Sequence, residues 1–254
     1  RRDRWVAGLI PSGWDPKKFG IPDDIINQVD RVTLYSLVAF VESLVASGVT
    51  DPYEFYKYVH VSKVGNSLGS GIGGMHALRQ MFTERKFGDA DHVQGNVLQE
   101  TFINTTAAWI NMLMLSASGP VKTPVGACAT AMESFAIAYD TITSGQAKIM
   151  VVGAFDDISE ESMLEFANMK ATCNNDDDTA KGRSPKEMCR PMTSSRAGFM
   201  ESHGAGIHVL MAGDLAVEMG VPIYAVLGQV HTAMDKEGRS VPAPGKGVLT
   251  VVSE

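Results

Sequence analysis

The sequence lacks the cysteine patterns of disulfide-bonded or zinc-binding proteins. It has only three cysteines, Cys128, Cys173 and Cys189, which are widely spaced and form no CxxC or Cys/His pair. Neither a disulfide framework nor a zinc site is therefore expected. Isolated cysteines in odd number favour a reducing compartment, so we expect a cytoplasmic protein.

Long apolar runs and basic clusters are also missing. No apolar stretch reaches the length of a membrane span, and no apolar signal region follows the first four residues. The 254 residues carry a net charge of -7 without a stripe of Lys and Arg, so neither a membrane nor a nucleic acid is expected as a partner. Because the chain begins without Met and ends without a helix cap, we expect it to be part of a longer protein.

A polar stretch over residues 172–186 contains three adjacent aspartates, Asp176, Asp177 and Asp178. They lack the spaced ligands and the glycine of a calcium loop, so no metal site is expected. We interpret this stretch as a solvated turn.

What the sequence does contain is a hydrophobic fraction of 44%, enough for one sizeable core, and an alternation of strand and helix patterns. Helices are expected after Asp23 and Asp24 up to Gly48, and over residues 160–169 and 214–219. A half-buried strand is expected over residues 59–68, buried strands over 148–154 and 207–211, and a further strand over 223–228. This alternation predicts a layered α/β core.

Residues 96–116 predict one helix that is apolar almost all round, with Phe102, Trp109 and Met112 among its side chains. Such a helix lies in a core or in a subunit contact. We favour the contact, because methionine side chains suit an adaptable apolar surface.

The run from Thr123 to Glu133 places Cys128 where a helix begins. We expect a buried strand before it, a sharp exit at Pro124 and Gly126, and a helix that Gly145 ends. Backbone N–H groups at a helix N-terminus favour the thiolate, and the small neighbouring residues leave room for a substrate carbonyl. A buried cysteine is often only a small apolar residue, yet this context predicts a nucleophile.

A glycine-rich turn, Gly69-Ser70-Gly71-Ile72-Gly73-Gly74, follows the strand expected over residues 59–68. A dinucleotide site is disfavoured, because no acidic ribose partner follows on a second strand. Glycines also let the backbone approach a ligand or a neighbouring strand, and we favour that use.

Taken in order, the sequence resembles the β-ketoacyl synthases, the condensing enzymes of fatty-acid and polyketide synthesis. The resemblance rests on the glycine turn, Gly126-Ala127-Cys128-Ala129-Thr130, Arg190-Pro191, Arg196-Ala197-Gly198-Phe199 and Gly204-Ala205-Gly206. Two flanking stretches, residues 119–124 and 238–247, look like the ketoacyl synthase domain of the fungal type I fatty acid synthase α subunit.

The resemblance implies a thiolase-like fold of layers αβαβα, built from two related halves, and a homodimer, for which we favour a contact through the 96–116 helix. Residues 1–254 would form most of the first half and the start of the second. Cys128 would take an acyl chain from acyl carrier protein and yield it to the carbanion formed by decarboxylation of malonyl-acyl carrier protein. Acyl groups would arrive on phosphopantetheine, with no cofactor in the domain itself, and other domains of a multienzyme fatty acid synthase would be partners.

Two further roles follow from the resemblance. The backbone N–H of Cys128 would be one oxyanion donor, and Gly71 and Ile72 would line the acyl pocket. The second oxyanion donor, two catalytic histidines and a lysine would lie downstream of Glu254. Arg190 and Arg196 would fix loops rather than take part in the chemistry.

The six histidines carry no paired-ligand pattern, and we expect His60, His76 and His92 to be structural or solvated and His208 and His231 to be core or edge residues. His203 stands where many relatives have an acidic residue.

Three alternatives stay open. The first is a cysteine hydrolase whose nucleophile turn resembles Gly-x-Ser-x-Gly, with His203, His208 or His231 as base. The second is a thiolase-type acyltransferase of the same fold, and the third is a segment that contributes only architecture to a large assembly.

Overall fold

The computed structural model describes residues 3–86, 97–115, 117–233 and 251. The chain forms two compact units, one made of Arg1–Trp14 and Asp157–Gly204 and the other of Asp15–Asp156 and Ala205–Glu254. His92 and the 238–247 stretch therefore lie outside the described residues.

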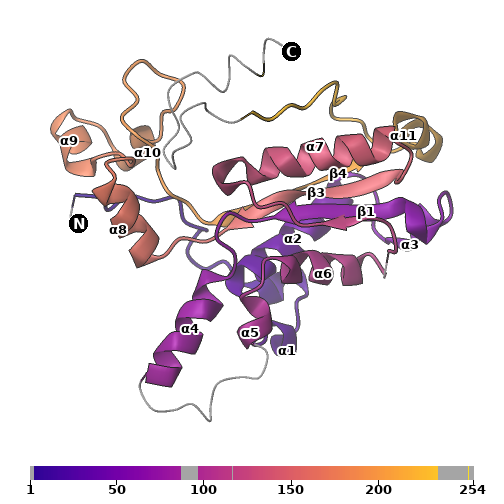
Figure 1. Cartoon of the computed structure of the whole chain (residues 1–254), viewed down its shortest axis with the longest axis horizontal. Coiled ribbons are helices and arrows are strands. Elements are labelled where there is room, and N and C mark those ends of the chain that lie inside the picture. Colours follow the sequence, from indigo (N-terminus) through magenta and orange to yellow (C-terminus); the bar gives the residue numbers. More distant parts are fainter. Residues whose placement is uncertain (1–2, 87–96, 116, 234–250, 252–254) are drawn as a thin grey trace. The chain divides into compact units, whose positions relative to one another are not determined.

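The larger unit is built around a four-stranded sheet of order β2-β1-β3-β4 (Figure 1). The central pair is parallel, with Val64 opposite Ile149 and Gly69 opposite Ala154, and β2 is also parallel to β1. The strands are β1 Val64–Gly69, β2 Val121–Lys122, β3 Ile149–Asp156 and β4 Gly204–Met211. Parallel strands need crossover connections, and the helices between these strands provide them.

Helices cover both faces of this sheet. Figure 1 shows α7 on one face and α2 and α6 on the other. The helices of this unit are α1 Asp23–Ile26, α2 Arg31–Ala46, α3 Tyr53–Tyr56, α4 Met75–Lys86, α5 Val97–Glu100, α6 Asn104–Leu113, α7 Thr130–Thr143 and α11 Gly213–Met219, with 3-10 turns at Pro16–Phe19, Val61–Lys63 and Ala127–Ala129. Because both faces are covered, β1 and the first five residues of β3 are buried, as the apolar run over 148–154 predicted.

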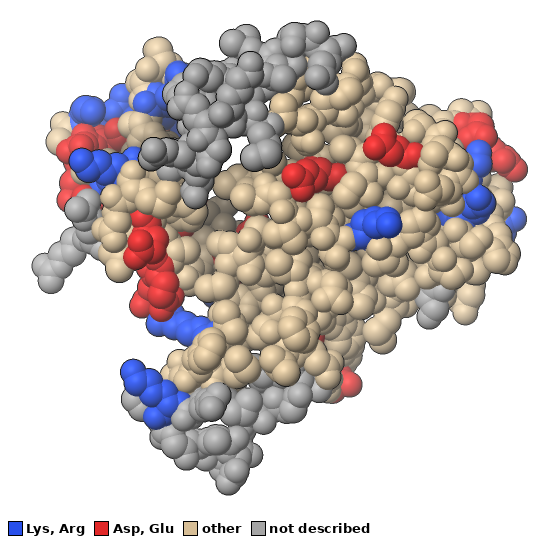
Figure 2. All heavy atoms as spheres, in the orientation of Figure 1, with Lys and Arg blue, Asp and Glu red and all other residues tan. Residues whose placement is uncertain are grey.

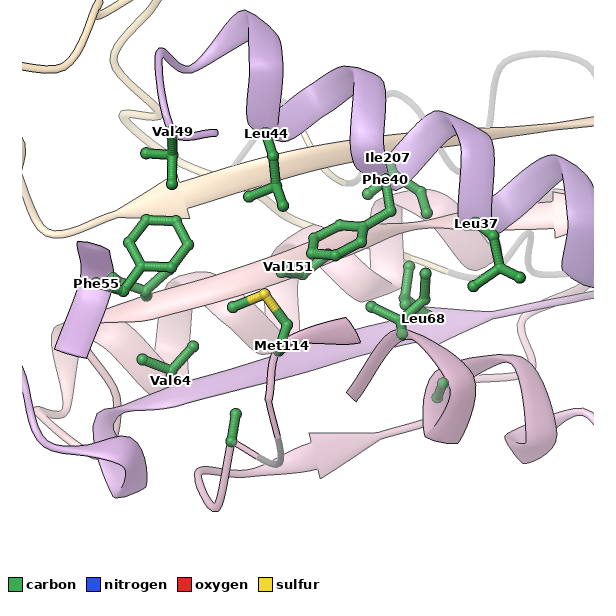
Figure 3. Packing of buried hydrophobic residues seen from close by; sticks show 14 of the residues in the cluster. Leu37, Phe40, Leu44, Val49, Phe55, Val64, Leu68, Met114, Val151 and Ile207 are labelled. Carbon is green, nitrogen blue, oxygen red and sulfur yellow. The ribbon is translucent and has the colours of Figure 1, made fainter. Parts of the chain in front are cut away.

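The main core lies between the sheet and α2. Phe40, Phe55 and Val151 are buried there, together with Leu37, Leu44, Leu68 and Met114 (Figure 3). A smaller cluster on the other face packs Ala138 of α7 against Met150 and Val152 of β3. This arrangement confirms the predicted layered α/β core.

Two N-terminal predictions were wrong in detail. The predicted helix that follows Asp23 and Asp24 is split, and its long part, α2, is capped by Asp30, whose side chain accepts from Val32 N–H at 3.1 Å. The strand predicted over 59–68 begins only at Val64 and is buried on both faces rather than half-buried.

Three other elements also differ from the prediction. The helix expected over 96–116 is two helices, α5 and α6, separated by three residues. The predicted strand over 223–228 forms no strand among the described residues, and Tyr224 and Val226 are 77% and 87% exposed. Strand β4 exists but is only partly buried, with Ile207 its buried apolar residue.

The smaller unit contains α8 Glu160–Asn168, α9 Asn175–Ala180 and α10 Pro185–Met188. Buried Asn175 binds the N-terminal segment, since its Oδ1 accepts from the backbone N–H groups of Trp5 (2.6 Å) and Val6 (2.9 Å). Helices α8 and α11 confirm two predicted helices.

The predicted solvated turn over 172–186 was wrong. Its aspartates belong to α9, and Asp178 is 1% exposed because it pairs with arginines inside the fold. Periodicity could not show this, since the stretch contains hardly any apolar residues.

Among the described residues, none of the helices combines the length and apolarity needed to cross a bilayer. The same residues hold no group of His, Cys, Asp or Glu that could bind a metal ion. On the face in view in Figure 2, the described Lys and Arg side chains form separate small groups rather than a continuous basic surface.

Candidate active site

Cys128 is exposed and lies in the 3-10 turn that leads directly into α7. The predicted position at a helix start is therefore confirmed. The buried strand expected before it is not, because β2 has two exposed residues and ends at Lys122. An irregular segment over residues 123–126 delivers the cysteine instead.

The turn that carries Cys128 is held by the first residue of α7. Thr130 is 1% exposed, and its hydroxyl accepts from Gly126 N–H at 3.0 Å and donates to Ala127 carbonyl oxygen at 2.6 Å. Ala127 has φ +50°, an uncommon conformation for a residue other than glycine. The two hydrogen bonds of Thr130 stabilise this conformation and so orient the next residue, Cys128.

The glycine turn lies against the cysteine turn. A Cβ on Gly71 would be 3.2 Å from the carbonyl oxygen of Ala127. A Cβ on Gly69 would collide with the carbonyl oxygen of Pro124. These glycines are therefore required for close approach of two backbones, as the sequence predicted. The structure thus brings together two predicted site segments, Gly71 and Ile72 on one side and Cys128 on the other.

Sequence reasoning missed Asp156, the last residue of β3. Its Oδ1 accepts from Ser70 Oγ at 2.7 Å, Gly71 N at 3.0 Å and Ile72 N at 3.1 Å. The sequence did contain a signal, a carboxylate at the carboxyl end of a predicted buried strand, where parallel sheets place functional groups.

The histidines considered as possible bases make other contacts. His208 is exposed on β4, at the edge of the described sheet, so it is an edge residue and not a core residue, and its ring packs edge-on against Phe135 at 5.3 Å between centroids. His231 is exposed and contacts the side chain of Gln229, and His60 caps the turn at Val61 and is hydrogen-bonded to Ser62. His203 belongs to the other unit, where its Nε2 accepts from Ile10 N–H at 2.9 Å.

The predicted loop-fixing role of the two arginines is confirmed. Arg190 binds both oxygens of Asp178, at 2.5 and 3.0 Å, and donates to Ser195 carbonyl oxygen at 2.9 Å, while Arg196 donates to Thr193 carbonyl oxygen at 3.2 Å. The Arg190 guanidinium lowers the pKa of Asp178 to about 2. Burial, together with Asp178, raises the pKa of the Cys173 thiol.

Cys173 is therefore unsuited as a nucleophile. It is 1% exposed, and its thiol donates to Asp178 Oδ2 at 2.9 Å. Cys128 and Cys189 are the exposed thiols, and Cys128 alone of the three lies at the start of a long helix.

Comparison with known proteins identifies the family. Residues 3–216 match the model of the β-ketoacyl synthase N-terminal domain. The chain belongs to the β-ketoacyl synthase family. Over all 254 residues it is 64% identical to the fatty acid synthase subunit alpha of Schizosaccharomyces pombe, and it spans 14% of the length of that relative.

Solved structures of β-ketoacyl synthases share the fold. A ketosynthase, FabY, from P. aeruginosa superposes with a TM-score of 0.83 at 24% identity, over 97% of this chain and 38% of that one. A type II polyketide ketosynthase solved in complex with its acyl-carrier protein gives 0.64 at 20% identity, over 85% of this chain and 56% of that one. These likenesses confirm the thiolase-like fold.

Proposed function

We propose that the chain carries the nucleophile of a 3-oxoacyl-[acyl-carrier-protein] synthase that elongates fatty acyl chains by two carbons. The observation that carries this proposal is the exposed thiol of Cys128 at the start of α7, in a chain of the β-ketoacyl synthase family. The identity to fungal fatty acid synthase α subunits supports a role in fatty-acid synthesis.

In the first step, the Cys128 sulfur attacks the thioester carbonyl of an acyl group on acyl carrier protein. A new thioester forms on the enzyme and the carrier thiol leaves with the proton. In the second step, malonyl-acyl carrier protein loses CO2, the resulting carbanion attacks the acyl carbonyl, and the Cys128 thiolate leaves. Both attacks place negative charge on a thioester oxygen, for which we propose the Cys128 backbone N–H as one donor.

The N-terminal end of α7 supports this role for Cys128. Partial positive charge accumulates where the first N–H groups of a helix lack intrahelical partners. The small side chains of Ala127 and Ala129 on either side are exposed, so a thioester can reach the sulfur. We assign no residue of this chain to the second oxyanion donor or to the catalytic histidines and lysine of the family.

The test uses the full-length protein and an acyl thioester carrier. We expect mass spectrometry to find an acyl adduct on Cys128 that malonyl thioester discharges with release of CO2. Cys128→Ser should abolish the adduct, whereas Cys189→Ser, at the other exposed thiol, should retain it. Rapid release of free acid would establish a hydrolase, and discharge by a free thiol without decarboxylation would establish a thiolase-type acyltransferase.

We further propose acyl carrier protein as the substrate carrier and the other domains of a multienzyme fatty acid synthase as partners. The solved ketosynthase bound to its acyl-carrier protein supports the first partner, and the α-subunit relatives support the second. On this proposal acyl groups arrive on phosphopantetheine, the domain needs no cofactor of its own, and the site is cytoplasmic.

We propose a homodimer through the α5 and α6 region. Apolar side chains are exposed along it: Leu98 (55%), Phe102 (54%), Met112 (62%) and Leu113 (39%). Such a patch suits a second copy of the chain. Met112→Glu should weaken the dimer in light scattering, and Val217→Glu, at a 72% exposed position of α11, should not.

We also propose that residues 1–254 represent most of the first half of the fold and the start of the second. On this basis the isolated 254 residues should be inactive and poorly soluble. Condensation by this fragment alone would refute the proposal.

A further inference from the structure

One carboxylate organises the turn beside Cys128. Three donors from consecutive residues converge on Asp156 Oδ1: Ser70 Oγ, Gly71 N and Ile72 N, at 2.7, 3.0 and 3.1 Å. Hydrogen bonds to a charged acceptor are stronger than neutral ones. Asp156 ends β3, a central strand whose first six residues, Ile149 to Ala154, pair with β1, so this acceptor lies two residues beyond the paired part of the strand.

The turn itself has few other means of keeping its shape. Glycines have no side chains to pack, and the turn consists largely of them. Ser70, which is fully buried, adds a second set of bonds by accepting from Gly73 N at 2.7 Å. Ser70 also donates to Asp156, so this hydroxyl links the two sets of bonds.

The position of this turn is transmitted to the nucleophile. Gly71 lies close to the backbone of Ala127, which is covalently joined to Cys128, and a Cβ on Gly71 would be 3.2 Å from the Ala127 carbonyl oxygen, tighter than an ordinary contact. The next residue, Ile72, projects a side chain that is 39% exposed. A shift of the turn therefore moves an apolar side chain relative to the thiol.

We propose that Asp156 is a positioning residue that determines which acyl groups reach Cys128, by holding Gly71 and Ile72 in place. This inference rests on the proposed acyl transfer to Cys128 and on the acyl pocket that the family resemblance implies at Gly71 and Ile72. Asp156 acts through the turn and takes no part in the bond changes. Without it, Gly71 N loses its carboxylate acceptor and Ile72 N keeps the longer bond to Ser70 Oγ at 3.3 Å. The turn then samples more positions, so the pocket discriminates less between acyl chains.

The experiment measures acylation of Cys128 in the full-length protein with acyl carrier thioesters of a short and a long chain. We expect Asp156→Ala to change the ratio of the two second-order rate constants by about tenfold, which is the effect of about one methylene in an apolar pocket. Asp156→Asn retains an oxygen acceptor and should restore most of the ratio. Ser70→Ala, which removes one donor, should change the ratio in the same direction as Asp156→Ala.

Two controls separate this role from general damage. Alkylation of Cys128 by iodoacetamide, which is too small to sense an acyl pocket, should stay within about twofold of wild type in Asp156→Asn. Asp214→Ala should leave the ratio unchanged. Asp214 pairs with Lys148 (3.0 Å), the residue before β3. Lys148 is eight strand residues from Asp156, which is a distance of about 26 Å along β3.

The outcomes are distinguishable. If wild-type protein forms no thioester on Cys128, the proposed function is wrong. If wild type and Asp156→Ala are acylated with the same chain-length ratio, the role of Asp156 is refuted while the function stands. If the ratio changes in Asp156→Ala and is not restored in Asp156→Asn, the negative charge, rather than the acceptor oxygen, holds the turn.

Discussion

Replacing Thr130 by valine tests how the nucleophile turn is held. The change keeps the methyl group that contacts Gly69 but removes a hydroxyl that bonds both Gly126 N–H and Ala127 carbonyl oxygen. Each such hydrogen bond contributes about 1 kcal/mol net, so the turn should lose about 2 kcal/mol. The loss falls on the segment where Ala127 has positive φ, so local opening should become easier than elsewhere.

Hydrogen exchange of the peptide covering residues 124–132, measured in the full-length protein, reports this opening. A loss of about 2 kcal/mol corresponds to a decrease in protection of about thirtyfold, because about 1.4 kcal/mol is a factor of ten. Thr143→Val is the matched control, since Thr143 is exposed near the other end of α7 and its hydroxyl donates to Tyr139 carbonyl oxygen. A change below about threefold in Thr130→Val, or an equal change in the control, would refute the reasoning.

Three further predictions follow. Gly69→Ala introduces a Cβ that collides with the carbonyl oxygen of Pro124, in the segment before Cys128. Overpacking usually costs about 1–3 kcal/mol, so acyl transfer to Cys128 should slow at least about fivefold, and an unchanged rate would show that the segment moves without cost. Because the pKa of Asp178 is lower in the fold, its ionised form stabilises the fold fully above the unfolded pKa of 3.8, and this contribution is lost as pH falls toward about 2. Hydrogen exchange of residues 172–190 should therefore rise over that pH interval in wild type. Asp178→Asn should show no such transition. Iodoacetamide should alkylate Cys128 faster than exposed Cys189 and far faster than buried Cys173 near neutral pH, and equal rates at the two exposed thiols would contradict activation by the helix.

The site residues that sequence reasoning found are those whose chemistry is local. Cys128 precedes a helix whose apolar spacing is visible along the chain, and the glycine turn follows a strand pattern. Asp156 was missed because nothing in its neighbourhood shows that it binds a turn 84 residues earlier.

Long-range pairing also explains the errors in the fold. Asp178 was assigned to a solvated turn because it stands in a polar stretch that lacks the ligand pattern of a calcium loop, yet Arg190, 12 residues later, neutralises it inside the fold. The 223–228 stretch has a strand pattern, but a strand forms only where a neighbouring strand supplies hydrogen bonds, and the described sheet supplies none there.

Local sequence patterns were enough to predict the layered α/β class, helices α7, α8 and α11 and the position of Cys128 at a helix start, because periodicity, glycine content and a cysteine before a helix are encoded by neighbouring residues. The tertiary structure decided that the glycine turn lies against Ala127, that Asp156 holds that turn and that Cys173 is enclosed. These are contacts between segments far apart in the chain, and they are set by strand register and packing, which no local pattern specifies.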